Sequence, residues 1–206
     1  MLYYLSIMAT YTTSDFRQIT WEQYEKALVL LESRLTALIK ERGLKIHAVV
    51  PILRGGAIPG QYLGYKLGVL RFMPVQYKYF KEGSEYKIKK IGSAVLEPGF
   101  EIKDGETILV AENNHCFGTT AKKVVEDLKE EYPSSKIIYA AVYMDFTNRE
   151  AVKADLCVYG EYTNETGGLS AEKVKEMGLP GKFGLYPWEN VAEEMAAVNS
   201  QPFMYN

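Results

Sequence analysis

The segment 108–121 constrains the fold more than any other part of the chain, because it reads as a strand that leads through a polar loop into a helix. Residues 108–111 are apolar, the next residues are polar, and Gly118 is followed by Thr119 and Thr120. Backbone N–H groups at a helix start lack intrahelical partners and carry a partial positive charge. A strand–loop–helix unit of this kind predicts an anion site at one edge of a sheet.

Strand-like and helix-like segments alternate through the chain. Strands are expected at 46–52, 69–80, 107–111, 137–144 and 155–159, and helices at 20–43, 56–68 and 119–131. The strands are near-continuous apolar runs, which indicates burial on both faces. This pattern predicts an α/β fold with a doubly wound, mostly parallel sheet. In such sheets ligands bind beyond the carboxyl ends of the strands.

Two of these helices carry clear local signals. Thr20 and Gln23 have the spacing of a capping box, and Gly43 is a natural stop. The apolar stripe of this helix consists of Trp21, Tyr24, Leu28, Leu31, Leu35 and Leu38. The later helix, 119–131, has an apolar face of Ala121, Val124, Val125 and Leu128. Stripes with this spacing predict helices that pack on a sheet.

The remaining segments are less regular. Residues 81–99 are polar and lysine-rich, which predicts a long loop or a mobile hairpin. Residues 1–9 are apolar but too short for a membrane span, so we expect an extra strand or a partner contact there. The sequence shows no linker or internal repeat. We therefore expect one domain, 1–206, with a small C-terminal hood formed by elements within 162–190 and the N-terminal segment.

Composition excludes several classes of protein. Of 206 residues, 47% are hydrophobic and 24% charged, as in a soluble globular protein. The formal net charge of −2 gives no general attraction to nucleic acid or to an anionic membrane, so neither is an expected partner. Two cysteines do not make a secreted disulfide scaffold, and we expect a cytoplasmic, reducing setting.

Two loops carry candidate binding groups. Side chains of Glu112 and Asn113 suit two neighbouring hydroxyls, and Thr119 and Thr120 can cap the helix or donate to a phosphate. The alternative is an ordinary turn with a threonine cap. The second loop is Leu53-Arg54-Gly55-Gly56, whose glycines allow close approach of the backbone and whose arginine suits phosphate. The alternative there is a glycine turn with a surface arginine.

Together these segments resemble the type I phosphoribosyltransferases, with purine- and xanthine-type members as the nearest pattern, over about Thr20 to Glu189. The resemblance rests on the approach 103–110, on Glu112 and Asn113 at the family's acid pair, on the two loops, and on the closing Tyr186-Pro187-Trp188-Glu189. It implies ribose binding by Glu112 and Asn113. It implies 5′-phosphate binding by Cys116, Phe117, Gly118, Thr119 and Thr120, pyrophosphate binding by Leu53, Arg54, Gly55 and Gly56, and base binding by Phe183, Trp188 and Glu189.

The resemblance also implies a reaction. A nitrogenous base of purine type displaces pyrophosphate from phosphoribosyl pyrophosphate (PRPP), through an oxocarbenium-like transition state, and forms a nucleoside monophosphate. Mg²⁺ is expected to be held by PRPP rather than by a protein cage. The expected partners are small molecules, and the apolar N-terminus suggests a homodimer contact. Segment 81–99 occupies the position of the family's flexible lid.

The sequence departs from the family's pattern near the reacting centre. Asn113 replaces the second acid, Cys116 stands at the position of the catalytic aspartate, and Phe117 replaces a threonine. Purine-salvage members carry a lysine where this chain has Met144 and Asp145. His115 is a candidate general base, although an exposed loop histidine is favoured. Cys116 is a candidate reactive thiol, because helix N-termini lower thiol pKa values, although a packing role is favoured.

Three functional hypotheses follow. The first is a divergent phosphoribosyltransferase, and the sequence favours this enzyme. The second is a non-catalytic relative that binds PRPP or a nucleotide as a sensor or partner module, which the replaced acids support. The third is a nucleotide hydrolase or another Rossmann-like enzyme, for which the sequence offers no nucleophile triad, P-loop lysine or metal-ligand spacing.

Overall fold

The computed structural model describes residues 11–82 and 85–200. Its main sheet has the strand order β4-β3-β2-β5-β6-β7. All neighbours are parallel except β3 and β4, which confirms the expected α/β fold with a mostly parallel sheet. The strands are β2 (Ala48–Leu53), β3 (Val75–Glu82), β4 (Glu85–Ser93), β5 (Thr107–His115), β6 (Lys136–Asp145) and β7 (Leu156–Thr163).

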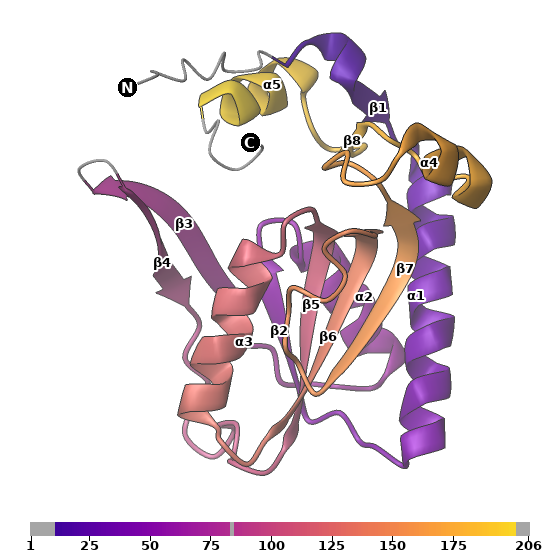
Figure 1. Cartoon of the computed structure of the whole chain (residues 1–206). Coiled ribbons are helices and arrows are strands. Elements are labelled where there is room, and N and C mark those ends of the chain that lie inside the picture. The colour runs from indigo at the N-terminus through magenta and orange to yellow at the C-terminus, as the bar shows by residue number, and fades with distance from the viewer. Residues whose placement is uncertain (1–10, 83–84, 201–206) are drawn as a thin grey trace, which may run out of the picture.

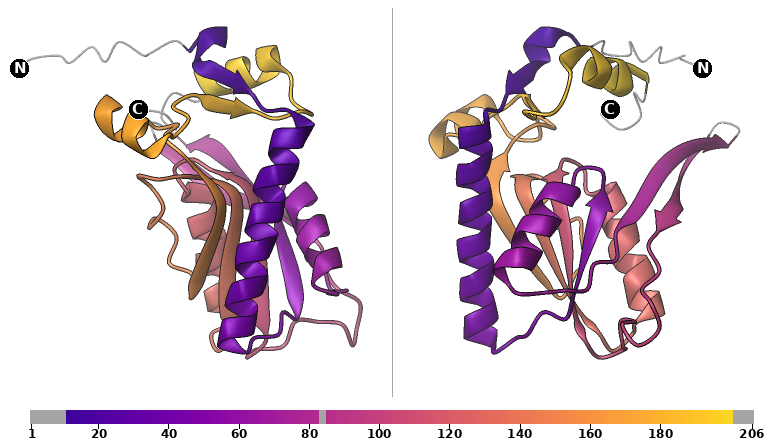
Figure 2. Two further views of the ribbon diagram at one scale, coloured as in Figure 1. Left: turned by 90° about the vertical axis from the view of Figure 1, so that its right-hand side faces the viewer. Right: turned by 180° about the vertical axis from the view of Figure 1, so that it is seen from behind.

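Helices cover both faces of this sheet. On one face lie α1 (Trp21–Arg42) and α2 (Ala57–Lys66), and on the other lies α3 (Thr119–Glu131), as Figure 2 shows. The central strand β5 supplies both cores, because Leu109 packs on the side of α1 whereas Ile108 packs on the side of α3. Burial on both faces explains why the strands read as continuous apolar runs.

The local signals of α1 are confirmed, with one exception. The Thr20 hydroxyl oxygen accepts from the Gln23 amide, and Gln23 Oε1 accepts from the Thr20 amide. Gly43 ends the helix in the left-handed conformation. The expected position of Trp21 in the buried stripe is wrong, because its side chain is 59% exposed at the first turn. The four predicted apolar residues of α3 are all buried.

Segments from the two ends of the described chain form a small layer above the carboxyl ends of the strands (Figure 1). Strand β1 (Phe16–Gln18) pairs in parallel with β8 (Phe183–Leu185). Around this pair lie the 3₁₀ helix η1 (Thr13–Asp15), α4 (Ala171–Met177) and α5 (Val191–Ser200). We call this layer the hood. The expectation for residues 1–9 lies outside the described residues, and the domain boundaries remain predictions.

The lysine-rich region forms a hairpin, one of the two structures expected for it. β3 and β4 pair in antiparallel register and project from the sheet, away from α1 (Figure 1). The strand expected at 69–80 begins later, since Phe72 makes only an isolated bridge to Val49. Within the described part of the chain, no helix is long and apolar enough to cross a membrane.

Candidate active site

The strand that leads to the candidate phosphate loop is longer than expected. β5 continues to His115, because Asn114 and His115 pair with Tyr143 and Met144 of β6. Glu112 and Asn113 therefore belong to the rigid end of a central strand rather than to a loop. The irregular segment that connects β5 with α3 contains only residues 116–118.

The two candidate loops meet at this edge of the sheet. A Cβ placed on Gly55 would lie 3.1 Å from Glu112 Oε1 and 3.2 Å from Asn113 Cβ, so the 53–56 loop approaches the end of β5 closely. The Leu53–Arg54 peptide bond is cis. A cleft of about 180 Å³ opens where the loops meet the hood. Its lining residues are Phe16, Gly55, Glu112, Asn113, Asn114, Phe183, Gly184, Tyr186, Glu189 and Glu194.

The start of α3 has the features of an anion site. Gly118 is its N-cap, with φ of 75°, and within the described part of the chain the first turn has no side-chain capping bond. The amides that follow Gly118 therefore keep their donors for a ligand or for water. Thr119 is exposed and Thr120 is half-buried. The structure places this predicted phosphate loop at the carboxyl edge of the sheet, while its binding role remains a prediction.

His115 is a buried residue, so the favoured expectation of an exposed loop histidine is wrong. Its side chain is 1% exposed. Nδ1 lies 2.9 Å from the Tyr139 hydroxyl and Nε2 lies 3.1 Å from the Asn148 carbonyl oxygen. Burial lowers the pKa of His115 to about 4, and the ring is neutral at physiological pH. It supports the turn at Gly118 from below and is not among the residues that line the cleft.

Cys116 does not provide a reactive thiolate. Burial raises the pKa of the Cys116 thiol, and the nearby carboxylates of Glu165 and Asp145 raise it further. The expected lowering by the helix terminus is therefore outweighed. The Cys116 carbonyl oxygen accepts from Asn148 Nδ2 at 2.9 Å, which fixes the backbone of the loop. The thiol stays protonated and cannot replace the carboxylate that the family places here.

Glu112 and Asn113 present oxygen atoms at the cleft that can accept hydrogen bonds from a ligand. Glu112 is half-buried and its Oε1 accepts from the Asn113 amide at 2.8 Å. Burial raises the pKa of Glu112 to about 8. Asn113 is 3% exposed, and its Oδ1 has no hydrogen-bond partner among the residues that the structure describes. A buried carbonyl oxygen without a donor is costly, so a ligand that brings hydroxyl groups or a hydrated cation suits this position.

Two of the three predicted base-binding residues line the cleft. Phe183 lies at its edge, and Glu189 accepts from the Tyr186 amide at 2.9 Å. Burial raises the pKa of Glu189 to about 7, while the exposed Arg54 guanidinium nearby lowers it. Trp188 is not among the lining residues. It stacks on Tyr186, with ring centroids 5.5 Å apart and planes at 14°. It also contacts Trp21 and Tyr24 of α1 and so packs the segment after β8 against this helix.

Sequence reasoning missed two buried carboxylates that join the hood to the sheet. Glu165 accepts from Asn114 Nδ2 at 2.9 Å and from the Gly184 amide at 3.0 Å. Asp145 accepts from the Thr166 amide at 2.8 Å and from its hydroxyl at 3.0 Å. Asp145, which stands with Met144 where the resemblance gives a lysine, thus fixes the loop after β7. Asn164 and Glu165 follow directly after β7, and this position at a strand end was a signal for polar groups there but not for their partners.

Within the described residues, no group of three or more His, Cys, Asp or Glu side chains is arranged to hold a metal ion. For a magnesium ion carried by PRPP, the carboxylate of Glu112 and the unpaired Oδ1 of Asn113 are the oxygen donors that fit.

The chain resembles known phosphoribosyltransferases in sequence and in structure. It is 29% identical over 107 residues, 52% of this chain, to an orotate phosphoribosyltransferase of Sulfurovum sp., and the match spans about half (47%) of that protein. It is 28% identical over 133 residues, 64% of this chain, to 70% of a xanthine-guanine phosphoribosyltransferase of Gluconobacter oxydans. No protein-family model matches the chain.

Two solved structures are similar over nearly their whole length. A purine phosphoribosyltransferase from Pyrococcus horikoshii superposes with a TM-score of 0.58 at 20% identity, covering 85% of this chain and 95% of that one. A Neisseria gonorrhoeae protein with bound ppGpp superposes with a TM-score of 0.61 at 17% identity, covering 90% and 96%. The chain therefore has the fold of the type I phosphoribosyltransferases and resembles that family in sequence.

Proposed function

We propose that the protein transfers the phosphoribosyl group of PRPP to a nitrogenous base of purine type and releases pyrophosphate. The observation that carries the proposal is that the 53–56 loop meets the end of β5, directly before the segment that leads into α3, at the carboxyl edge of the sheet. Gly55 of the first loop lies against Glu112 and Asn113, and α3 begins at Thr119, six residues after Asn113. The similarity to curated orotate and xanthine-guanine phosphoribosyltransferases supports the same reaction class.

Each part of the cleft has a task in this reaction. The amides at the start of α3 bind the 5′-phosphate, and the 53–56 loop with Arg54 binds the pyrophosphate. Glu112 and Asn113 hold the ribose hydroxyls. Ionised Glu112 also lies where it can stabilise the positive charge that develops on the ribose. When bound with PRPP, Mg²⁺ neutralises the phosphates of the leaving group.

Neither Cys116 nor His115, the two residues expected to act as the catalytic acid or base, has a side chain that is suited to that role. The Cys116 thiol stays protonated, and His115 is buried with both ring nitrogens engaged. General acid–base catalysis contributes about 10²–10⁴-fold in enzymes that have it. We therefore expect turnover that is slow relative to enzymes with the full set of acids.

The direct test is nucleotide formation. Protein, PRPP and Mg²⁺ are incubated with adenine, guanine, hypoxanthine, xanthine or orotate, and the monophosphate is detected by mass spectrometry. Product with a purine supports the proposal. Protein that binds PRPP but forms no product with any base contradicts it.

The second candidate function is binding of PRPP or a nucleotide without catalysis. Asn113 and Cys116 favour it, and so does the structural neighbour that was solved with ppGpp. Restoring both acids separates the two candidates. A gain of turnover in the Asn113→Asp, Cys116→Asp double variant supports lost catalysis in this chain, whereas a fall from existing turnover supports a working enzyme that uses the residues it has.

A further inference from the structure

A second cavity adjoins the cleft. It has a volume of about 370 Å³ and lies between the phosphate loop, η1 and the loop after β7. Its lining residues are Tyr11, Ser14, Asp15, Phe117, Glu165, Thr166, Gly167, Gly181, Lys182 and Phe183. Phe183 lines both the cleft and this cavity. A ligand seated at the end of β5 can therefore extend around Phe183 into the second space.

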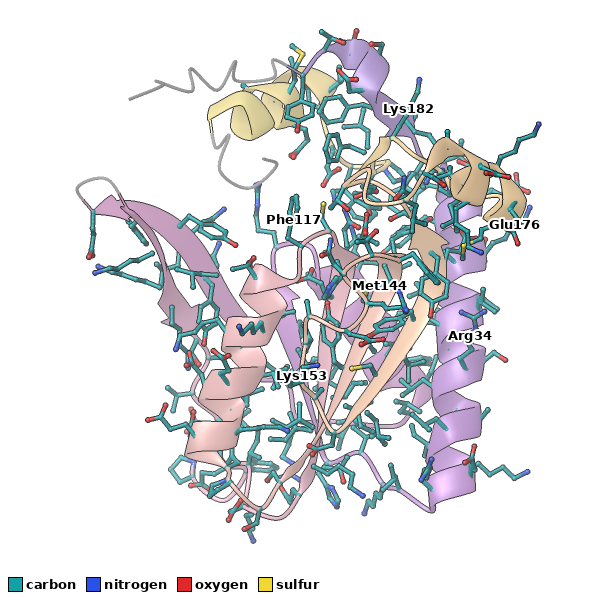
Figure 3. The ribbon with its side chains drawn as sticks, in the orientation of Figure 1. Arg34, Phe117, Met144, Lys153, Glu176 and Lys182 are labelled. Atoms are coloured by element: carbon teal, nitrogen blue, oxygen red, sulfur yellow. The ribbon has the colours of Figure 1, made fainter. Side chains whose placement is uncertain are left out.

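Phe117 is the unusual member of this lining. It stands between Cys116 and Gly118 in the phosphate loop, where the resemblance gives a threonine with a phosphate-binding hydroxyl. A phenyl ring offers no such hydrogen bond. The half-buried side chain of Phe117 points from the sheet edge toward the hood (Figure 3). Phe117 can therefore present its backbone to the phosphate and its ring to the second cavity.

Phe183, another aromatic residue in the lining of this cavity, is held in place by neighbouring rings. Its centroid lies 5.2 Å from that of Tyr11, with planes at 82°, and 5.9 Å from that of Phe16. Edge-to-face contacts of this kind fix the orientation of a ring. A planar ligand therefore meets a ring whose position is set before binding, which limits the ordering cost of stacking.

We infer that Phe117 adds a second aromatic wall to the subsite for the base, in the cavity that it lines together with the already predicted Phe183, and that Phe117 is a specificity-determining residue. This inference rests on the proposed function and deepens it. Because every nucleobase has a π-face, such walls accept the planar base of a nucleoside 5′-monophosphate. Thr166 and Lys182 supply polar groups at the margin of the cavity, where ring nitrogens and exocyclic groups would lie.

If Phe117 contacts the base, substitutions at this residue should change the affinity for nucleotides without weakening the affinity for a sugar phosphate that lacks a base. Replacing Phe117 by alanine removes a stacking surface but keeps the loop amides. Replacing it by threonine also adds a hydroxyl beside the phosphate. Both changes should weaken binding of nucleoside monophosphates about tenfold. Neither should weaken binding of ribose 5-phosphate, which carries the same phosphate and sugar without a base, and Phe117→Trp should retain the affinity for nucleotides.

The experiment is calorimetry with ribose 5-phosphate and with AMP, GMP, IMP, CMP and UMP on the wild type and the three variants. Phe100→Ala is the matched control, because Phe100 is 61% exposed in the segment between β4 and β5 and lines neither cavity. Thermal unfolding of every variant monitors the fold. Selective loss of nucleotide affinity in Phe117→Ala and Phe117→Thr supports the inference.

Three results would overturn it, and they differ from one another. Equal loss of ribose 5-phosphate and nucleotide affinity would show that Phe117 merely supports the loop. Unchanged nucleotide affinity in Phe117→Ala would show that the base lies elsewhere while the proposed function stands. Wild-type protein that binds none of these phosphates would remove the proposed function and the inference with it.

Discussion

Loss of the Glu112 proton should make the protein less stable as pH rises through neutrality. Burial raises the pKa of this carboxyl from its ordinary value of 4.5 to about 8. The folded protein therefore holds a proton that the unfolded chain has lost, and stability falls with pH between these two values. At about 1.36 kcal/mol per pKa unit, the full effect between pH 6.5 and 8.5 is about 2 kcal/mol. Because the side chain is only half-buried, screening should reduce the observed loss to roughly 1–2 kcal/mol.

Urea unfolding at pH 6.5, 7.5 and 8.5 measures this loss directly. In the Glu112→Gln variant the side chain cannot titrate, so its stability should fall less over the same range. Glu189, with a pKa of about 7, adds a smaller loss of the same sign that both proteins share. In the unfolded chain His115 titrates near its ordinary pKa of 6.5, so at the low end of this range it adds a small gain of stability with pH that both proteins share. Parallel pH profiles of wild type and variant would refute the burial argument for Glu112.

Three further predictions concern the same edge of the sheet. Gly118→Ala should lower the free energy of unfolding, measured in urea, by about 2–4 kcal/mol, because the added Cβ would meet the His115 ring at a backbone position with positive φ. Gly105→Ala is the control, since Gly105 also has a positive φ but lies in open space, and it should cost only about 1–2 kcal/mol. Equal costs would contradict the steric argument. Asp145→Asn should lower the free energy of unfolding by about 1–3 kcal/mol and speed hydrogen exchange in the loop after β7, since an amide satisfies the Thr166 donors less well than the carboxylate does. Unchanged exchange would argue against a role of Asp145 in holding this loop. In the wild type, the affinity for Mg²⁺-bound PRPP should rise between pH 6.5 and 8.5 as Glu112 ionises, whereas in Glu112→Gln it should stay constant. Calorimetry measures both affinities, and the same pH profile in both proteins would exclude Glu112 from the site.

Local signals predicted the elements whose causes lie within a few residues. The capping box at Thr20 and the stop at Gly43 set the bounds of α1, and the apolar spacing of α3 predicted its buried face. The continuous apolar strands predicted a parallel sheet covered on both sides. The candidate loops were placed together because carboxyl ends of parallel strands share an edge.

Features that depend on distant partners escaped sequence reasoning. The polar residues after Ala111 read as a loop, yet pairing with β6 makes them strand. His115 is buried because Tyr139, 24 residues later, offers its hydroxyl. The hood depends on the pairing of β1 with β8, which are far apart in the chain. No local pattern could show that Glu165 would join Asn114 to this hood.

The central claim is that the start of α3 binds the 5′-phosphate of a pentose whose hydroxyls lie on Glu112 and Asn113. A crystal structure of the protein with ribose 5-phosphate tests it most directly. We expect the phosphate on the amides of residues 117–120 and a ribose hydroxyl within hydrogen-bond distance of Asn113 Oδ1, which has no partner among the described residues. A sugar phosphate bound elsewhere, with this oxygen still unpaired, would contradict it.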